Sequence, residues 1–209
     1  MLVIDVLDLA GTAAFAISGA LVGIKNRLDL FGIFVLAVVT ASGGGLMRDV
    51  IIGDYWPAFF SQPKYLISII ISTAAICVCL KYMGKMATLI RVFDAIGLGV
   101  FTVLSAYKCM KFDMPLIGII FTAMLTGIGG GVLRDVMVRS VPLVFRSEIY
   151  ALASIIGALM FYFLYGLINL QVNIYLCVFV TFAIRMVSMY YNLNLPVIKP
   201  KSEDTGVQN

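Results

Sequence analysis

The chain has 209 residues, of which 62% are hydrophobic and only 12% are charged, and its formal net charge is +4. A mean hydropathy of +1.05 excludes an ordinary water-soluble domain and indicates a membrane protein. The chain contains no histidine, which excludes a Cys/His nucleophile and argues against a zinc site built on the four cysteines.

Seven apolar segments approach the length of about 20 residues that a helix needs to cross a bilayer. The fourth is short, and the second and fifth contain glycine runs. We therefore expect an all-α membrane protein with one transmembrane domain, residues 1–198, and a loose cytoplasmic tail, residues 199–209. In chain order the predicted spans are 6–24, 30–50, 65–81, 92–107, 114–137, 149–169 and 173–191.

Two runs of three glycines interrupt these apolar segments, and an Arg-Asp pair follows each run. They are Gly43–Gly45 with Arg48 and Asp49, and Gly129–Gly131 with Arg134 and Asp135. A glycine inside a helix costs about 0.5–1 kcal/mol relative to alanine. The runs therefore predict places where the backbone breaks or is approached closely.

The chain contains an internal duplication. We assign repeat one to residues 5–85, repeat two to residues 91–170 and a seventh helix to residues 173–191. After a one-residue slip, the residues Pro57, Phe60 and Tyr65 match Pro142, Phe145 and Tyr150 at a separation of 85. The pairs separated by 86 residues are Asp8 and Asp94, Gly11 and Gly97, Phe15 and Phe101, Ala20 and Ala106, Lys25 and Lys111, Gly32 and Gly118, Ala37 and Ala123, Thr40 and Thr126, the three glycines of each run, Arg48 and Arg134, and Asp49 and Asp135.

Each repeat contains three helices, so the second repeat must enter the bilayer from the opposite side, which predicts inverted repeats. Basic loop residues then orient the protein, because they gather on the cytoplasmic side. This places the N-terminus outside and the C-terminus in the cytoplasm, and the positive charge predicts no nucleic-acid partner. The cytoplasmic set is Lys25, Arg27, Lys81, Lys85, Arg91, Arg139, Arg146, Lys199 and Lys201, against Lys64, Lys108 and Lys111 outside.

Inverted repeats with interrupted helices are one way to build a solute path near the bilayer midplane. A helix opened at a glycine run would free carbonyl oxygens, which can replace the water shell of a permeant cation. The alternative is that the glycines only allow close helix packing, as small residues at four-residue spacing do in membranes. Three glycines in succession favour the path.

Ionisable residues inside the spans are candidates for function. Arg48 and Asp49 are adjacent, and adjacent residues face different ways on a helix, so we expect each to find another partner. The topology brings Asp8 close to Arg48, and Asp94 close to Arg134. The alternatives are ion pairs to the opposite repeat's aspartate, or pairs that only hold helices together.

The two Gly-Gly-Gly-x-x-Arg-Asp motifs, one per three-helix unit and followed by a seventh helix, resemble those of the prokaryotic trimeric intracellular cation (TRIC) channel family, also catalogued as a glycine transporter domain. The resemblance covers about residues 5–191. It implies an inner-membrane homotrimer surrounded by lipids, with no cofactor, in which each subunit has its own pore for monovalent cations, chiefly potassium. The pore would be lined by kinked second and fifth helices, with potassium or sodium near the glycine runs. The pore candidates are Thr40, Ser42, Gly43, Gly44, Gly45, Thr126, Gly129, Gly130 and Gly131, and the candidate gating charges are Arg48, Asp49, Arg134, Asp135, Asp8 and Asp94.

Other interpretations are weaker. A secondary transporter of a small solute, such as the amino acid glycine, could also use inverted repeats for alternating access. A structural protein would leave the buried charges without a role, and an enzyme is not expected because no nucleophile is paired with a base. Arg185 has no counterpart in the duplication, and we expect its side chain to snorkel to the cytoplasmic interface.

Overall fold

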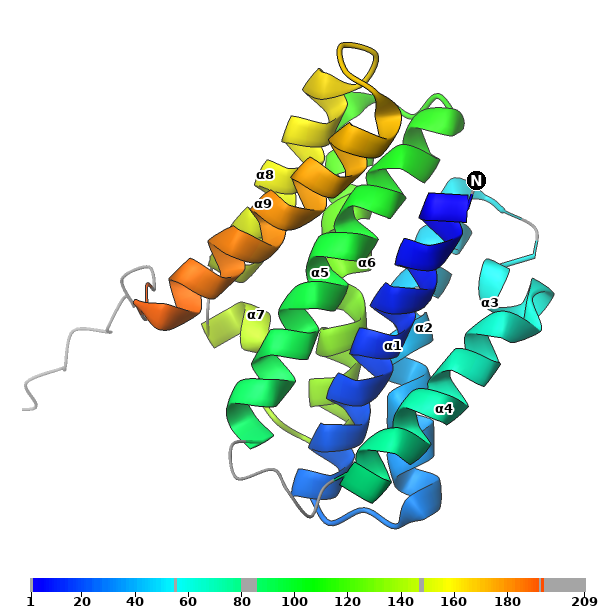
Figure 1. Ribbon diagram of the computed structural model, residues 1–209, viewed down its shortest axis with the longest axis vertical. Helices are drawn as coiled ribbons and strands as arrows, with labels where there is room; N and C mark the ends of the chain where they lie inside the picture. The colour runs from blue at the N-terminus through cyan, green and yellow to red at the C-terminus, as the bar shows by residue number, and fades with distance from the viewer. Residues whose placement is uncertain (1, 55, 80–85, 147–148, 192, 194–209) are drawn as a thin grey trace, which may run out of the picture.

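The computed structural model describes residues 2–54, 56–79, 86–146, 149–191 and 193, which fold into a bundle of helices (Figure 1). Within these ranges the regular elements are nine helices, which confirms the predicted all-α class. Five of them are long and apolar enough to cross a membrane, and the shorter helices α4 and α8 are also apolar. The helices are α1 (Leu2–Lys25), α2 (Leu30–Ile52), α3 (Ala58–Ser61), α4 (Pro63–Cys79), α5 (Met86–Lys111), α6 (Leu116–Met137), α7 (Leu143–Arg146), α8 (Ile149–Leu164) and α9 (Leu170–Tyr190).

Each predicted span overlaps one of the helices, but the length of α5 and the presence of α3 and α7 differ from the prediction. The fourth span was expected to be short, yet α5 has 26 residues and is the longest of the described helices, because it continues over residues 86–91 before the predicted span and over residues 108–111 after it. The four-residue helices α3 and α7, which were not predicted, follow Pro57 and Pro142. The tail at 199–209 lies outside the described residues.

Local sequence signals set the ends of α2. The side chain of Asp29 accepts a hydrogen bond of 2.7 Å from the Gly32 N–H, which satisfies a donor that the first turn leaves free. The helix stops at Gly53, whose φ of 78° lies in the left-handed region that glycine adopts without a steric penalty. The helix is therefore fixed at both ends, on either side of the glycine run.

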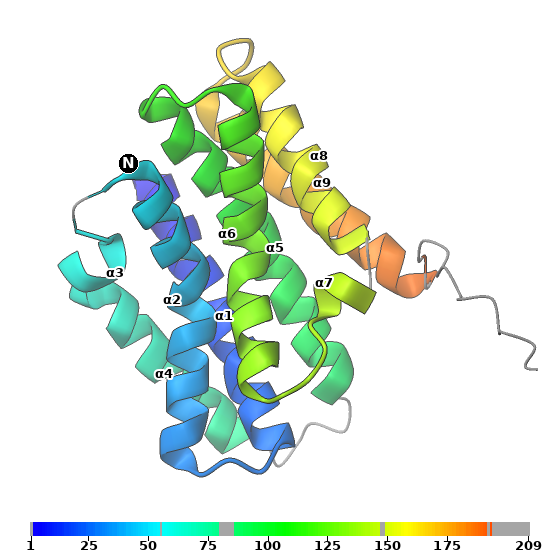
Figure 2. The same ribbon diagram turned by 180° about the vertical axis from the view of Figure 1, so that it is seen from behind.

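Four helices, α1, α2, α5 and α6, form the centre of the bundle, with α4 packed on α1 and with α8 and α9 packed on α5 (Figures 1 and 2). Helices α1 and α5 run in opposite directions in Figure 1. Where they meet, the rings of Phe15 and Phe101 stack with centroids 5.4 Å apart. Gly97 lies against this stack, since a Cβ at that position would overlap the ring of Phe15. Positions related by the duplication therefore touch each other at the centre.

The middle glycine of each run allows α2 and α6 to cross closely. A Cβ on Gly44 would overlap the carbonyl oxygen of Thr126, and a Cβ on Gly130 would overlap the carbonyl oxygen of Thr40. Both helices continue without interruption through their glycines, so the predicted break is wrong. The physical reason is that the absence of a side chain at these glycines lets the backbones of α2 and α6 approach each other closely. This is the packing alternative.

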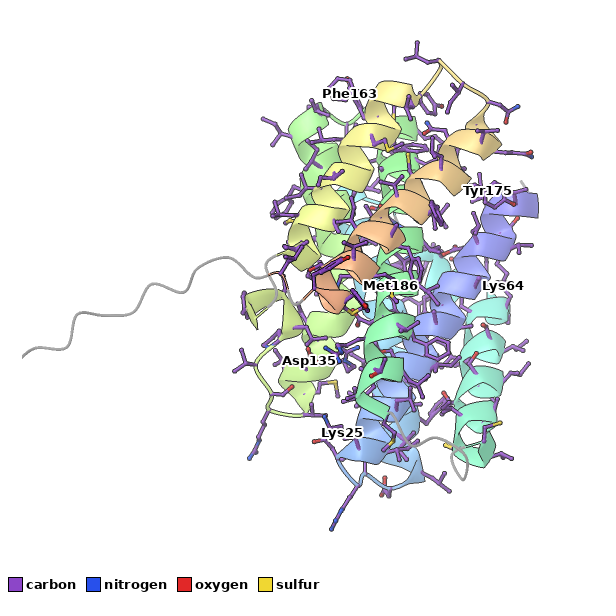
Figure 3. The ribbon with its side chains drawn as sticks, turned by 60° about the vertical axis from the view of Figure 1, so that its left-hand side comes forward. Lys25, Lys64, Asp135, Phe163, Tyr175 and Met186 are labelled. Carbon is purple, nitrogen blue, oxygen red and sulfur yellow. The ribbon has the colours of Figure 1, made fainter. Side chains whose placement is uncertain are left out.

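The outer surface is apolar, as a lipid-facing surface must be. Phe163 on α8 is 63% exposed and Tyr175 on α9 is 52% exposed, and both project away from the bundle (Figure 3). The buried interior, in contrast, contains Arg48, Arg134 and Arg185. Charges that lie inside an apolar protein, instead of at its surface, point to the functional site.

Candidate functional site

The third glycine of each run faces charged side chains. A Cβ on Gly131 would lie 3.1 Å from Asp94 Oδ1, and the nearest atom to a Cβ on Gly45 would be a terminal guanidinium nitrogen of Arg48 at 4.0 Å. Two equivalent clusters result, toward opposite ends of the four central helices. We call Asp8, Gly45, Arg48, Asp49 and Tyr65 the first half-site, and Asp94, Gly131, Arg134, Asp135 and Tyr150 the second half-site.

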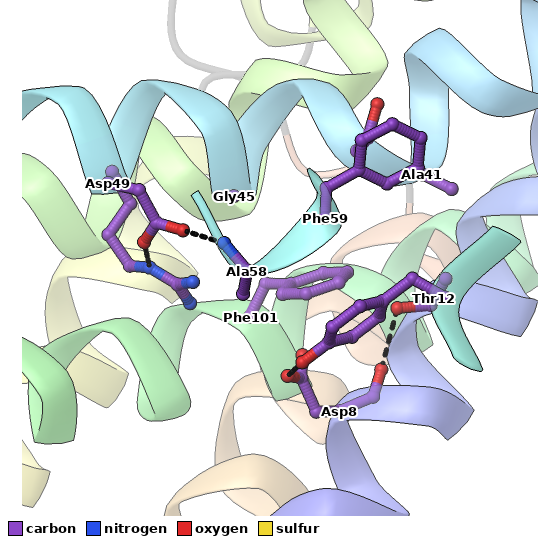
Figure 4. Close-up of a pocket in the computed structure, with 11 residues that line it drawn as sticks. Asp8, Thr12, Ala41, Gly45, Asp49, Ala58, Phe59 and Phe101 are labelled. Carbon is purple, nitrogen blue, oxygen red and sulfur yellow. Dashed lines mark hydrogen bonds and ion pairs between the residues drawn. The ribbon is translucent and has the colours of Figure 1, made fainter. Parts of the chain in front are cut away.

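In the first half-site, Arg48 and Asp49 bind each other (Figure 4). The Arg48 Nε–H donates to Asp49 Oδ1 at 2.7 Å, and the N–H of Ala58 donates to Asp49 Oδ2 at 3.0 Å. The expectation that adjacent residues are poorly placed to pair is therefore wrong for Arg48 and Asp49. The arginine side chain is long enough to fold back toward its neighbour, and burial of both groups, at 6% and 1% exposure, makes the pairing necessary.

The other carboxylate of the first half-site, Asp8, accepts a hydrogen bond from the Tyr65 hydroxyl. A cavity of about 30 Å³ lies between Asp8, Ser42 and Arg48 and extends inward to Phe101 (Figure 4). This volume holds a water molecule or an ion of similar size. The first half-site thus has a small space, of mixed polar and apolar lining, beside a carboxylate.

In the second half-site, the arginine reaches both aspartates. Arg134 donates from Nε to Asp135 Oδ1 at 2.8 Å and from a terminal nitrogen to Asp94 Oδ1 at 2.6 Å. The same terminal nitrogen donates to Ser18 Oγ at 2.6 Å, and the Tyr150 hydroxyl donates to Asp94. The Arg134–Asp94 pair confirms the predicted partnership.

The two half-sites are therefore in different states. Among the described residues no ion pair joins Arg48 to Asp8, so that predicted pair is wrong in this conformation, and the predicted pairs with the opposite repeat's aspartate are also absent there. The space in the second half-site that corresponds to the first cavity leaves no room for a water molecule. A buried arginine bridge closes the second half-site, while the first remains partly open.

Arg185 extends the second half-site to α9. Its side chain is only 2% exposed, and its guanidinium carbon lies 4.6 Å from the centroid of the Tyr150 ring. The prediction that Arg185 snorkels to the interface is wrong, because the face of a buried aromatic ring provides an attractive site for the cation. Its position also balances the surplus of carboxylates in the second half-site.

The remaining pore candidates lie along the crossing of α2 and α6. Ser42 lines the first cavity, whereas Thr40 and Thr126 are fully buried and donate to the carbonyl oxygens four residues earlier in their own helices, at 2.6 Å each. Gly43 and Gly129 pack against the opposite helix. Of the predicted pore hydroxyl residues, Ser42 therefore lines a cavity, whereas Thr40 and Thr126 are buried at the crossing of α2 and α6.

Sequence reasoning missed several residues of the site: Tyr65, Tyr150, Ser18 and Lys108. The two tyrosines recur in the duplication at a separation of 85, and this recurrence was a usable signal. Lys108 and Ser18 have no equivalent charged or hydroxyl residue, so the duplication could not identify them.

Comparisons with known proteins agree with one another. The family model described as Glycine transporter matches residues 5–82 and again residues 91–166. The chain is 37% identical to the UPF0126 inner membrane protein YadS of Escherichia coli K12, over 91% of this chain and 93% of that protein. It is 36% identical to the UPF0126 membrane protein YvgT of Bacillus subtilis, over 92% of this chain and 95% of that one.

Solved structures of similar fold are cation channels by their descriptions. A prokaryotic TRIC channel in 0.5 M KCl has a TM-score of 0.88 and 31% identity, over 93% of this chain and 99% of the other. The TRIC trimeric intracellular cation channel orthologue from Rhodobacter sphaeroides has a TM-score of 0.88 and 25% identity, over 92% of this chain and 100% of the other.

Proposed function

This chain belongs to the TRIC channel family, whose sequence model is described as Glycine transporter, and we propose that it conducts potassium along a pathway inside each subunit of a homotrimer. The similarity to solved cation channels supports the transport of a cation. We propose a trimer because the structural relative from Rhodobacter sphaeroides is a trimeric intracellular cation channel orthologue. We propose potassium as the permeant ion because the two glycine motifs resemble those of the TRIC family.

The observation that carries the proposal is the cavity of the first half-site. Its lining includes Asp8, Ser42 and Tyr65 together with Arg48 and Asp49, and among the described residues Arg48 pairs with Asp49 and not with Asp8. Because Arg48 is bound to Asp49, the Asp8 carboxylate is the acidic group left without a direct ion pair in this cavity, and a carboxylate with hydroxyl oxygens favours a cation over an anion or an apolar solute. The cavity is also lined by Gly45, the third glycine of its run, and the family resemblance predicts the ion near the glycine runs.

The pathway continues across the centre to the second half-site. The stack of Phe15 on Phe101 and the crossing of α2 with α6 lie between the two half-sites. We propose seven membrane spans, with α1 to α4 and α5 to α8 as inverted repeats and α9 as the seventh span. The opposite directions of α1 and α5 support this arrangement (Figure 1). On this topology, the first half-site faces the outside of the cell and the second faces the cytoplasm.

The arginines are the gates in this proposal. Conduction requires Arg134 to leave Asp94, because the bridge between them fills the second half-site. Arg48 is held by Asp49 and leaves the cavity at Asp8 accessible. The present conformation therefore has the second gate closed and the first partly open.

Recordings of the purified protein in planar bilayers test the proposal. Discrete potassium current steps that rise with ion concentration are expected. The secondary transporter of a small solute is not favoured by the solved relatives, which are described as channels. Saturable glycine exchange in proteoliposomes without unitary currents would support that transporter and refute the channel.

A further inference from the structure

Lys108 lies at the edge of the first half-site, where it binds Asp49. It lies in the last turn of α5, and its Nζ donates to Asp49 Oδ1 at 2.9 Å and to Asp54 Oδ2 at 2.7 Å. Asp49 is 1% exposed on its side chain, whereas Asp54 is 34% exposed, so the ammonium bridges a buried carboxylate and one at the surface. The positive charge of Lys108 therefore lies between a carboxylate at the surface and a carboxylate in the interior.

Among the described residues, no lysine bridges Asp135 to a second group in this way, although the backbone of the second half-site is arranged like that of the first. The N–H of Asp54 donates to the Asp49 carbonyl at 2.9 Å, and the N–H of Ser140 donates to the Asp135 carbonyl at 2.9 Å. Ser140 therefore takes the place of Asp54. By the 86-residue separation, the equivalent of Lys108 is Val22.

An open cavity lies where the second half-site lacks the lysine. It measures about 280 Å³ and is lined by Val22, Arg134, Asp135 and Ser140, with Lys25 and Arg91 at its wall. Figure 3 shows Asp135 and Lys25 toward this end of the bundle. The two sides thus differ: an ammonium bridges two carboxylates at the first half-site, whereas a hydroxyl replaces one of these carboxylates and a cavity lies beside Asp135 at the second.

We propose that Lys108 is a tethered cation that occupies the ion-binding position between Asp49 and Asp54, so that a permeating cation enters this side only in competition with it. The proposal rests on the proposed channel function. An ammonium held by two carboxylate oxygens sits where a potassium ion entering the same entrance would be coordinated. The competition acts on one entrance only, so the channel carries unequal currents in the two directions.

Removing the ammonium leaves the buried carboxylate paired and frees the surface one. Asp49 retains its bonds from Arg48 and from the Ala58 N–H, while Asp54 loses its cation. The entrance becomes more negative by one charge and attracts potassium. This attraction is screened by salt, because the Debye length falls from about 8 Å at 0.15 M to about 3 Å at 1 M.

Single-channel recordings of Lys108→Met test the competition, with Lys111→Met as the matched control. Lys111 lies one turn further along α5, and its ammonium packs over the Tyr107 ring at 4.6 Å from the centroid. In 0.15 M KCl we expect Lys108→Met to raise the current from the first half-site's side about twofold or more relative to the opposite direction. The change should fade in 1 M KCl. An unchanged current ratio, or an equal change in Lys111→Met, would overturn the proposal.

Thermal unfolding provides a readout that does not depend on conduction. If potassium takes the vacated position, Lys108→Met should unfold about 2–4 °C higher in KCl than in the chloride of a large organic cation, because a bound ligand stabilises the native state. Wild type and Lys111→Met should show no such difference. If Lys108→Met unfolds at the same temperature in both salts, the proposed binding position is contradicted. If Lys108→Met shows the temperature difference but no variant carries current, only the channel function is contradicted.

Discussion

Replacing Gly44 by alanine tests the packing role of the middle glycine. A Cβ there would overlap the carbonyl oxygen of Thr126, which is backbone and cannot turn aside. Helices α2 and α6 must then separate. Gly45 is the matched control, because it is in the same helix, one position later, and a Cβ there would be 4.0 Å from its nearest neighbour, a guanidinium nitrogen of Arg48.

The expected effects of the two substitutions have opposite signs. Replacing glycine by alanine inside a helix gains up to about 1 kcal/mol, and Gly45→Ala should keep that gain. Overpacking at Gly44 costs about 1–3 kcal/mol in addition. The difference between the two variants is therefore about 1–3 kcal/mol, which corresponds to a melting temperature about 2–12 °C lower for Gly44→Ala.

The assay is thermal unfolding of the purified variants in the same detergent, with Gly130→Ala as the equivalent substitution on α6. Gly130→Ala should behave like Gly44→Ala, since its Cβ would overlap the carbonyl oxygen of Thr40. If Gly44→Ala unfolds at the same temperature as Gly45→Ala, α2 and α6 do not cross as described and the packing account fails. The same account predicts that leucine at Gly44 and Gly130 lowers stability as well as potassium flux.

Further predictions concern charge and assembly. Asp94→Asn should destabilise the protein by about 3–5 kcal/mol, because it removes the cross-helix ion pair of the buried Arg134 guanidinium. Asp8→Asn should cost only about 1 kcal/mol, and equal losses in thermal unfolding would contradict the difference between the half-sites. Asp8→Asn should also depress potassium conductance, and an unchanged current would remove Asp8 from the pathway. Native mass measurement in mild detergent should give a trimer, and a monomer that still conducts would show that assembly is not required.

The duplication made much of the fold and of the site predictable. It identified both Arg-Asp pairs, the glycine runs and the two aspartates on α1 and α5, and the structure gathers these residues into two clusters. The order of helix ends predicted the Arg134–Asp94 pair, although the same argument failed for Arg48 and Asp8. These features depend on helix length and repeat spacing, which a sequence records directly.

The remaining features depend on side-chain reach and on crossing geometry. Arg48 folds back to Asp49 because a long side chain can reach an adjacent residue when both are buried, although the helical spacing suggests otherwise. The glycines could have opened the helix or allowed close crossing, and only the position of Thr126 against Gly44 decides between them. Arg185 is buried because the Tyr150 ring lies beneath it, and no residue spacing records that contact.

The most direct test of the two-gate pathway compares Arg134→Gln with Arg48→Gln in planar bilayers in symmetric potassium. A unit charge 4 Å from a permeating ion costs about 4 kcal/mol at an effective dielectric of about 20, so loss of an arginine can speed passage by up to about a thousandfold. Both variants should conduct more than wild type, with the larger rise in open probability for Arg134→Gln, because Arg134 forms the bridge that closes the second half-site. Asp49→Asn should instead depress the current. If Arg48→Gln and Asp49→Asn alter the current in the same direction and by the same amount, the charges serve folding alone and the gating account is contradicted.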